Sequence, residues 1–256
     1  MTVRKTRTAP PIIAIRFNGK TDASTSIDMS SQILVGQLPM MWAPDSARVA
    51  IVGYGSGVTV GSVLTHPVKS VDVVEIEPAV LSADQYFRPY NNDPTHDPRL
   101  TVHFDDGRMF IAHAPRAYEV IISEPSNPWL AGVNNLFTVE YYKLIKQHLK
   151  KGGVFCQWMQ FYEMSGVTLG SLMRSLHEVF PKAQIFLSNR DILFVATEDD
   201  RPLDLRQVAR RLERPQVAKD LARANIRTPA DLVGLRQASL PAVLPNLPAA
   251  PLNLDD

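Results

Sequence analysis

The residues best suited to chemistry in this chain begin with a glycine-rich loop between two apolar runs. The segment RVAIVGYGSG at 48–57 ends in a loop that carries Gly53, Gly55 and Gly57. A second apolar run, VDVVEIE at 71–77, brings Glu75 twenty-two residues after the first of these glycines. Glycines let the backbone approach a ligand, and an acid after the next strand can accept hydrogen bonds from two ribose hydroxyls. The pattern predicts a nucleoside site at the C-terminal edge of a parallel sheet, and a purely structural turn is the alternative.

The spacing of the glycines bears on which nucleoside is bound. A dinucleotide-binding fingerprint would place its third glycine at position 58, where this chain has Val58. The observed form, G-x-G-x-G with Ser56 inside it, is usual in enzymes that bind S-adenosylmethionine. The loop therefore favours a sulfonium nucleoside over a dinucleotide.

A pair of acids follows the next predicted strand. Asp105 and Asp106 precede Gly107, at the end of a segment that we expect to be the third strand of the sheet. An acid here can accept a hydrogen bond from an adenine amino group, whereas Asp-Gly alone is also a common turn. In series with the glycine loop and Glu75, the adenine interpretation is favoured.

The loop SEPSNPW at 123–129 follows the fourth predicted strand. A carboxylate at Glu124, beside a bound sulfonium, suits an amine substrate, because an alkyl ammonium with a pKa of ~10.4 must lose a proton before it attacks. A helix-capping or solvent-facing acid is the alternative for Glu124. Trp129 is a candidate to pack over a ligand, with an ordinary core position as the alternative.

Alternating strands and helices must position these loops. Strands are expected at 48–53, 71–76, 100–104, 118–123 and 153–159, and helices at 57–65, 78–88, 138–149 and 166–179. Such alternation predicts parallel pairing through right-handed crossovers, with helices on both sheet faces. Two further strands, 184–187 and 192–196, flank a turn and predict an antiparallel hairpin at the end of the sheet.

The chain divides by composition into four parts. Residues 1–45 form an N-terminal element with a β-rich segment and a helix, and residues 46–198 form the ligand-binding domain. Residues 199–240 are expected to be a short helical extension. The Pro-rich tail 241–256 is expected to be disordered.

Composition narrows the function classes. Lys plus Arg 27 against Asp plus Glu 26 leaves a net charge of +1, so no global field attracts nucleic acid. The single cysteine, Cys156, lies in an apolar strand and is expected to be core, and it fits a reducing compartment. No signal peptide is recognised, and no apolar run reaches the roughly 20 residues of a membrane span. We therefore expect a cytoplasmic protein with no membrane span, no nucleic-acid partner and no metal.

Taken together, these segments resemble the polyamine aminopropyltransferases, the spermidine synthase family. The resemblance is closest to the spermidine-synthase-like domain that bacteria often fuse to a membrane segment, and it covers roughly residues 12–198. Its most specific stretch is EVIISEPSNPWLAGVNNLFTVEYY at 119–142. The family implies a doubly wound, Rossmann-like α/β core in the S-adenosylmethionine-dependent methyltransferase fold, with seven strands and a small N-terminal β element. It also implies decarboxylated S-adenosylmethionine as donor and aminopropyl transfer to a small amine such as putrescine.

The resemblance assigns roles to individual residues. It places Glu75 on the ribose, and Asp106 with Gly107 on the adenine, beside the glycine loop. Glu124 stands where the family has its aspartate base. The remaining candidates are Asn127 for catalysis and, for substrate binding, Gln37, Trp129 and Gln157.

Several candidates depart from the family pattern. Asn127 replaces a second aspartate that helps to bind the amine, Ser56 replaces an aspartate in the glycine loop, and Gln37 falls where the family often has histidine. Each departure removes negative charge or a polar contact from the amine site, and one charge-assisted hydrogen bond is worth ~1.5–3 kcal/mol. The donor site is thus expected to be intact, while the acceptor is left open.

Three functions remain in competition. The first is aminopropyl transfer to an amine, the second is methyl transfer from S-adenosylmethionine itself, and the third is a non-catalytic nucleoside-binding domain. The sequence leaves open the oligomeric state, with a homodimer as one option, and whether the chain belongs to a longer protein.

Overall fold

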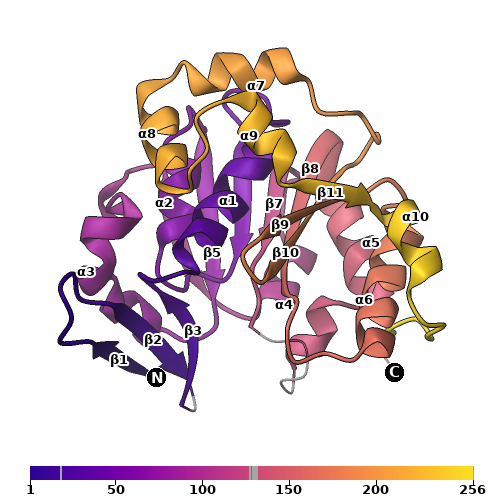
Figure 1. Ribbon diagram of the computed structural model, residues 1–256, viewed down its shortest axis with the longest axis horizontal. Coiled ribbons are helices and arrows are strands. Elements are labelled where there is room, and N and C mark those ends of the chain that lie inside the picture. Colours follow the sequence, from indigo (N-terminus) through magenta and orange to yellow (C-terminus); the bar gives the residue numbers. More distant parts are fainter. Residues whose placement is uncertain (18, 127, 129–131, 256) are drawn as a thin grey trace.

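A mixed eight-stranded sheet forms the centre of the protein, as shown by a computed structural model that describes residues 1–17, 19–126, 128 and 132–255 (Figure 1). Its strands are β4 (Arg48–Val52), β5 (Ser70–Glu75), β6 (Leu100–Phe104), β7 (Tyr118–Ser123), β8 (Leu149–Gln160), β9 (Gln184–Ser188), β10 (Asp191–Thr197) and β11 (Arg236–Ser239). They lie in the order β11-β9-β10-β8-β7-β4-β5-β6. This is the doubly wound α/β architecture expected from the alternation of strands and helices.

The five strands from β4 to β8 pair in parallel, so their carboxyl ends meet at one edge. β10 pairs antiparallel with both β8 and β9, which confirms the predicted terminal hairpin. The expected seven-strand core corresponds to β4–β10. The eighth strand, β11, was not expected, because its sequence RQAS has no apolar alternation and it forms only by pairing with β9.

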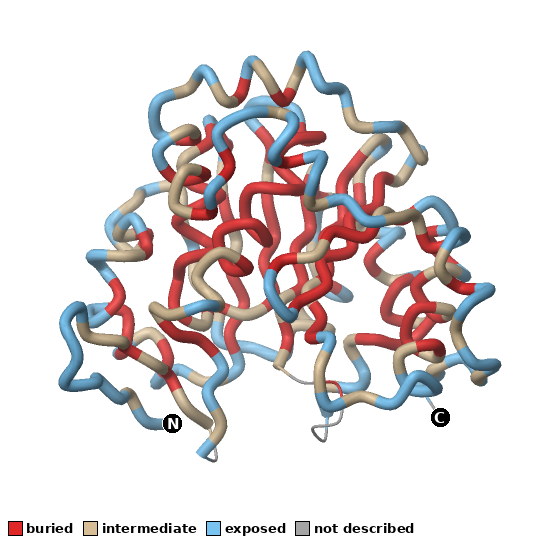
Figure 2. The backbone as a smooth tube through the Cα atoms, viewed as in Figure 1, coloured by how far each residue is buried: buried red, intermediate tan, exposed pale blue. Residues whose placement is uncertain are grey.

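Helices cover the two faces of this sheet and create two apolar cores (Figure 2). One face carries α1 (Met29–Met40), α2 (Val58–Leu64), α7 (Leu205–Leu212), α8 (Pro215–Arg223) and α9 (Pro229–Gly234). The other face carries α4 (Gly107–Ala112), α5 (Val139–His148), α6 (Gly166–Val179) and α10 (Leu240–Val243). Cys156 is fully buried in the first core, where burial raises the pKa of its thiol, so it is a core residue as expected.

Helix α1 is buried on all sides, which fits its lack of a polar face. It contacts α2, α8 and the strands β7 and β8. The approach to α2 is close, because a Cβ on Gly36 would lie only 2.6 Å from the backbone oxygen of Thr59. Position 36 therefore needs glycine, and this contact fixes where α1 packs along its axis against the first turn of α2.

A separate three-stranded antiparallel sheet forms the N-terminal β element. It contains β1 (Thr2–Lys5), β2 (Ile13–Phe17) and β3 (Lys20–Ser24). Ile13 and Ile15 of β2 pack on Ala83 and Phe87 of α3 (Ala79–Asn91). This small sheet is thereby held beside the sheet edge at which the parallel strands end (Figure 1).

The C-terminal tail packs on the body of the protein. Arg174 of α6 donates to backbone oxygens of the tail, and the backbone N–H of Val139 donates to the oxygen of Asn253 at 3.0 Å. The Asp255 carboxylate accepts hydrogen bonds from Arg108 and Thr138. The expected disorder of 241–256 is therefore wrong for the described part: a Pro-rich segment with little structure of its own is ordered by contacts with α5 and α6.

None of the described helices combines the length and the apolar character needed to cross a bilayer. Three short 3₁₀ turns complete the described secondary structure, at Pro94–His96, Val133–Leu136 and Leu244–Asn246.

Candidate functional site

The glycine loop after β4 needs glycine for two separate reasons. Gly53 has φ +97°, and a Cβ there would lie 2.6 Å from the backbone oxygen of Glu124. Gly57 has φ +76°, and a Cβ there would lie 2.6 Å from the hydroxyl of Tyr54. L side chains rarely adopt such φ values. Gly55 also has a positive φ, of +53°, but its Cβ direction is open apart from Ala23 at 4.0 Å.

Glu75 ends β5 directly opposite this loop. The residue as a whole is 9% exposed, and Oε2 of its carboxylate accepts a hydrogen bond from the backbone N–H of Tyr54 at 2.9 Å. Oε1 accepts one from the backbone N–H of Glu77, also at 2.9 Å. Each carboxylate oxygen has a second lone pair, so Glu75 can still accept two ligand hydroxyls while the backbone fixes its orientation.

The predicted adenine loop follows β6 beside Glu75. Phe104 is in register with Glu75, and the N–H of Asp105 donates to the Glu75 backbone oxygen at 3.3 Å. Asp106 caps α4, with Oδ1 accepting from the N–H of Met109 at 2.9 Å, so the capping and ligand interpretations are compatible. At Gly107 a Cβ would lie 2.4 Å from Cγ1 of Val52, so the loop packs tightly on β4.

Polar side chains that sequence reasoning missed support the glycine loop. The hydroxyl of Ser56 donates to Oε1 of Gln32 in α1, and Nδ2 of Asn91 donates to the Ser56 backbone oxygen at 3.0 Å. The buried carboxylate of Asp84 accepts from Tyr54 at 2.5 Å and from Asn91 at 2.8 Å. No local pattern marked these residues, because their proximity to the loop depends on how α1 and α3 pack.

Glu124 lies next to the glycine loop, immediately after β7. Its N–H donates to the backbone oxygen of Val52 at 2.9 Å, and its own oxygen abuts Gly53. Burial and, to a smaller extent, the charges of Asp191 and Asp28 raise the pKa of Glu124 to about 8, although a hydrogen bond from Thr59 opposes the shift. A carboxyl group with a raised pKa therefore lies beside the glycine loop, where the sequence predicts a sulfonium nucleoside.

This elevated pKa predicts how stability depends on pH. Between pH 4.5 and about 8, the carboxyl group of Glu124 is ionised in the unfolded chain but keeps its proton in the folded protein. Folding in this range must therefore take up a proton, so the free energy of unfolding falls as the pH rises. We expect the free energy of unfolding of the parent to fall by about 2–4 kcal/mol relative to Glu124→Gln across this range, at about 1.4 kcal/mol per unit of pKa. Urea unfolding of both proteins at pH 5 and pH 8.5 checks this, and equal pH slopes would contradict it.

The structure does not bring Gln37 to the ligand edge. Gln37 is fully buried near the far end of α1, where Nε2 donates to Asp220 at 2.8 Å and Oε1 accepts from His66 at 2.8 Å. Nε2 of Gln37 also donates to the hydroxyl of Thr65, just beyond the C-terminus of α2. This end of α2 lies roughly 10 Å along the helix from the glycine loop. The prediction that Gln37 binds substrate is therefore corrected: its amide joins α1 to α2 and α8.

Gln157 and Glu124 lie on opposite faces of the sheet. Gln157 is in register with Ser123 and opposite Phe194, whose side chain belongs to the core under α5 and α6. Glu124 follows Ile122, which belongs to the core under α1. Gln157 is fully buried and its amide has no partner among the described residues, but it does not face Glu124. Its predicted contact with substrate stays a prediction.

Asn127 and Trp129 lie outside the described residues, so their predicted roles remain predictions. The start of their loop is anchored to the N-terminal sheet, because the hydroxyl of Ser126 donates to Oδ2 of Asp22 at 2.8 Å. Among the residues for which the structure gives positions, no group of three or more His, Cys, Asp or Glu side chains is arranged to hold a metal ion.

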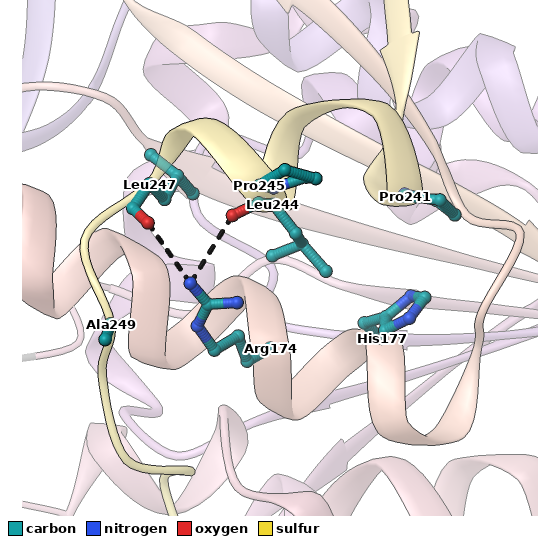
Figure 3. A pocket seen from close by; sticks show the side chains of 7 residues that line it. All are labelled: Arg174, His177, Pro241, Leu244, Pro245, Leu247 and Ala249. Carbon is teal, nitrogen blue, oxygen red and sulfur yellow. Dashed lines mark hydrogen bonds between the residues drawn. The ribbon is translucent and has the colours of Figure 1, made fainter.

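A hollow of about 480 Å³ lies elsewhere, between α6 and the C-terminal tail (Figure 3). In Figure 3 the guanidinium of Arg174 donates to the backbone oxygens of Leu244 and Leu247, at 3.4 and 3.2 Å. The hollow contains none of the predicted site residues. Because its main cation is engaged with the tail, we assign the hollow to tail packing.

Comparisons with known proteins show the family and the fold of this chain. The chain is 31% identical to a polyamine aminopropyltransferase of Bacillus subtilis over 157 residues, which cover 61% of this chain but only 56% of that protein. It has the fold of a spermidine synthase solved with the transition-state analogue AdoDATO (TM-score 0.69, 23% identity, covering 77% of this chain and 71% of the other). It also resembles human methyltransferase-like protein 13 solved with SAH (TM-score 0.54, 20% identity, covering 78% and 90%). The family model described as the spermine/spermidine synthase domain matches residues 29–190, a range that contains the glycine loop, Glu75, the Asp106 loop and Glu124. The chain therefore belongs to the spermine/spermidine synthase family.

Proposed function

We propose that this chain is an aminopropyltransferase that uses decarboxylated S-adenosylmethionine and an amine acceptor. The observation that carries the proposal is the position of Glu124, whose backbone abuts Gly53 while Glu75 reaches the same loop through Tyr54. A ribose acceptor and a candidate base thus lie on two sides of one loop. Family membership supports the choice of donor.

In the proposed reaction the lone pair of the acceptor nitrogen attacks the aminopropyl carbon bonded to sulfur. The C–N bond forms as the C–S bond breaks, and sulfur retains the electron pair as neutral 5′-methylthioadenosine. The proton lost from the amine passes to the carboxylate of Glu124. A base with a pKa of about 8 suits this step near neutral pH, and the approach of an ammonium favours its ionised form.

Direct measurement of both products tests the proposal. The full chain is incubated with decarboxylated or intact S-adenosylmethionine and with putrescine, and the nucleoside products are identified by mass spectrometry. We expect 5′-methylthioadenosine from the decarboxylated donor, released in equal amount with an aminopropylated amine. Calorimetry should show tighter binding of the decarboxylated donor, which is the donor that the proposal requires.

Other outcomes favour the competing functions. Release of S-adenosylhomocysteine with a methylated acceptor would replace the proposal with methyl transfer. Tight binding of 5′-methylthioadenosine without turnover on any amine tested would indicate a nucleoside-binding domain.

The sequence analysis also predicted that the chain resembles most closely the spermidine-synthase-like domain that bacteria often fuse to a membrane segment. That closer likeness stays a prediction.

A further inference from the structure

Helix α8 is tied to the end of α3 by two charged side chains. The guanidinium of Arg223 donates to the backbone oxygen of Tyr90, and its Nη1 donates to Oδ1 of Asp220 at 2.7 Å. Nδ2 of Asn92 donates to the same oxygen of Asp220 at 2.9 Å. Asp220 is only 2% exposed, so the contact between the two helices is centred on a buried carboxylate. These four residues form what we call the α3–α8 junction.

Asn91 lies in the middle of this junction, but its side chain is directed to the glycine loop. Nδ2 of Asn91 donates to the backbone oxygen of Ser56 at 3.0 Å and to Oδ1 of Asp84 at 2.8 Å. The same oxygen of Asp84 accepts from the hydroxyl of Tyr54 at 2.5 Å. Asn91 is fully buried and therefore connects the end of α3 to two residues of the loop, one directly and one through Asp84.

The backbone at the end of α3 depends on its neighbours. Asn92 has φ +60° and Asp93 has φ +50°, and two successive L residues rarely adopt this left-handed region unless other groups hold them. The backbone oxygen of Asn91 also packs against α2, where a Cβ on Gly61 would lie 1.7 Å from it. A steric contact limits approach but does not prevent separation. The attractive contacts of the α3–α8 junction are therefore needed to keep Asn91 in place.

We propose that Asp220 and Arg223 are positioning residues of the donor site, which hold the end of α3 so that Asn91 fixes the Ser56 carbonyl in the glycine loop. The inference rests on the proposed function, because it concerns the loop that we propose binds decarboxylated S-adenosylmethionine. Helix α8 lies beyond residues 29–190, the range that the family model matches. Donor affinity therefore depends on a segment of the chain outside the matched range.

Nucleoside affinity in variants of the α3–α8 junction tests this inference. Binding of 5′-methylthioadenosine to the full chain is measured by titration calorimetry for the parent, Arg223→Met and Asn92→Gly. Methionine cannot donate to Tyr90 or Asp220, whereas glycine at position 92 suits the left-handed backbone and removes only the hydrogen bond to Asp220. We expect each variant to bind about 2–30-fold more weakly than the parent, the usual range for residues that act on a site through packed intermediates.

A double-mutant cycle with Asn91→Ala shows whether the effect of Arg223 passes through Asn91. If it does, Arg223→Met should weaken binding by less than about twofold once position 91 is alanine. A merely structural role for Arg223 would give affinity losses that multiply in the double variant, or a lower thermal midpoint with parent-like affinity. Either result would overturn the inference.

Two further variants separate positioning from charge and from folding. Arg223→Lys keeps the charge and one donor group, so it should bind more tightly than Arg223→Met. Arg210→Met removes an exposed guanidinium from the neighbouring helix α7 and should bind like the parent.

The possible failures of this experiment are distinguishable. Parent-like affinity in Arg223→Met and Asn92→Gly would overturn the inference and leave the proposed function intact. If circular dichroism shows that Arg223→Met is unfolded, Asn92→Gly decides the question, because it removes a single hydrogen bond. Failure of the parent itself to bind 5′-methylthioadenosine would contradict the proposed donor site, and the inference with it.

Discussion

Replacing Glu124 with glutamine is expected to lower kcat by about 10²–10⁴-fold, the usual contribution of a positioned general base. The glutamine side chain keeps the shape of the carboxyl group but can neither accept the amine proton nor attract an ammonium. The glycine loop contacts the backbone of Glu124, which the substitution preserves. Donor affinity should therefore change by less than about twofold, far below the change in kcat.

The pH profile gives this prediction a second readout. Because the base must be ionised and its pKa is about 8, kcat/KM of the parent should rise with pH through that value. In Glu124→Gln, the rise of kcat/KM that is due to ionisation of Glu124 should be absent. Only the pH dependence that is due to deprotonation of the amine substrate should remain. Steady-state rates of 5′-methylthioadenosine release between pH 6 and 10 measure both effects.

A matched substitution makes the comparison specific. Glu178 lies exposed on α6, so Glu178→Gln changes the same functional group away from the sheet edge and should leave kcat within about twofold of the parent. If Glu124→Gln turns over as fast as Glu178→Gln at saturating substrate, the base lies elsewhere. Asp106 would be tested next, although its N-cap hydrogen bond makes it a poorer base.

Replacing Glu75 with alanine is expected to weaken binding of 5′-methylthioadenosine by at least about 10–150-fold, which corresponds to about 1.5–3 kcal/mol. The substitution removes the acceptor for two ribose hydroxyls. It also frees the N–H groups of Tyr54 and Glu77, which the carboxylate now holds at 2.9 Å. Loss of this support loosens the glycine loop, so the effect can exceed that of the ligand contacts alone.

Titration calorimetry of Glu75→Ala, Glu75→Gln and Glu178→Ala resolves these contributions. Glutamine retains one acceptor oxygen and should bind with intermediate affinity, whereas Glu178→Ala should match the parent. Thermal unfolding of each variant reports whether the loop defect extends to the whole fold. Parent-like affinity in Glu75→Ala would remove Glu75 from the site.

The sequence by itself determined the parts of this protein that depend on local pattern. Apolar runs marked the core strands, so β4–β7 and the β9–β10 hairpin lie close to their predicted bounds. β8 begins at Leu149, four residues before its predicted start at 153. Parallel pairing then required the loops after β4, β5, β6 and β7 to meet at one edge, and this brought Gly53, Glu75 and Glu124 together in advance of any coordinates. The arrangement of the proposed donor site was predictable for this reason.

Tertiary structure alone decided the features that depend on packing between distant segments. The close contact of Gly36 on Thr59 places Gln32, and not Gln37, at Ser56. Strand β11 and the C-terminal tail are ordered by neighbours that their own sequences do not specify. Asp191 and Gln160 are 31 residues apart in the chain, and only the antiparallel register of β8 and β10 puts them side by side. Contacts between segments far apart in the chain form only when those segments pack together, so no local pattern could specify them.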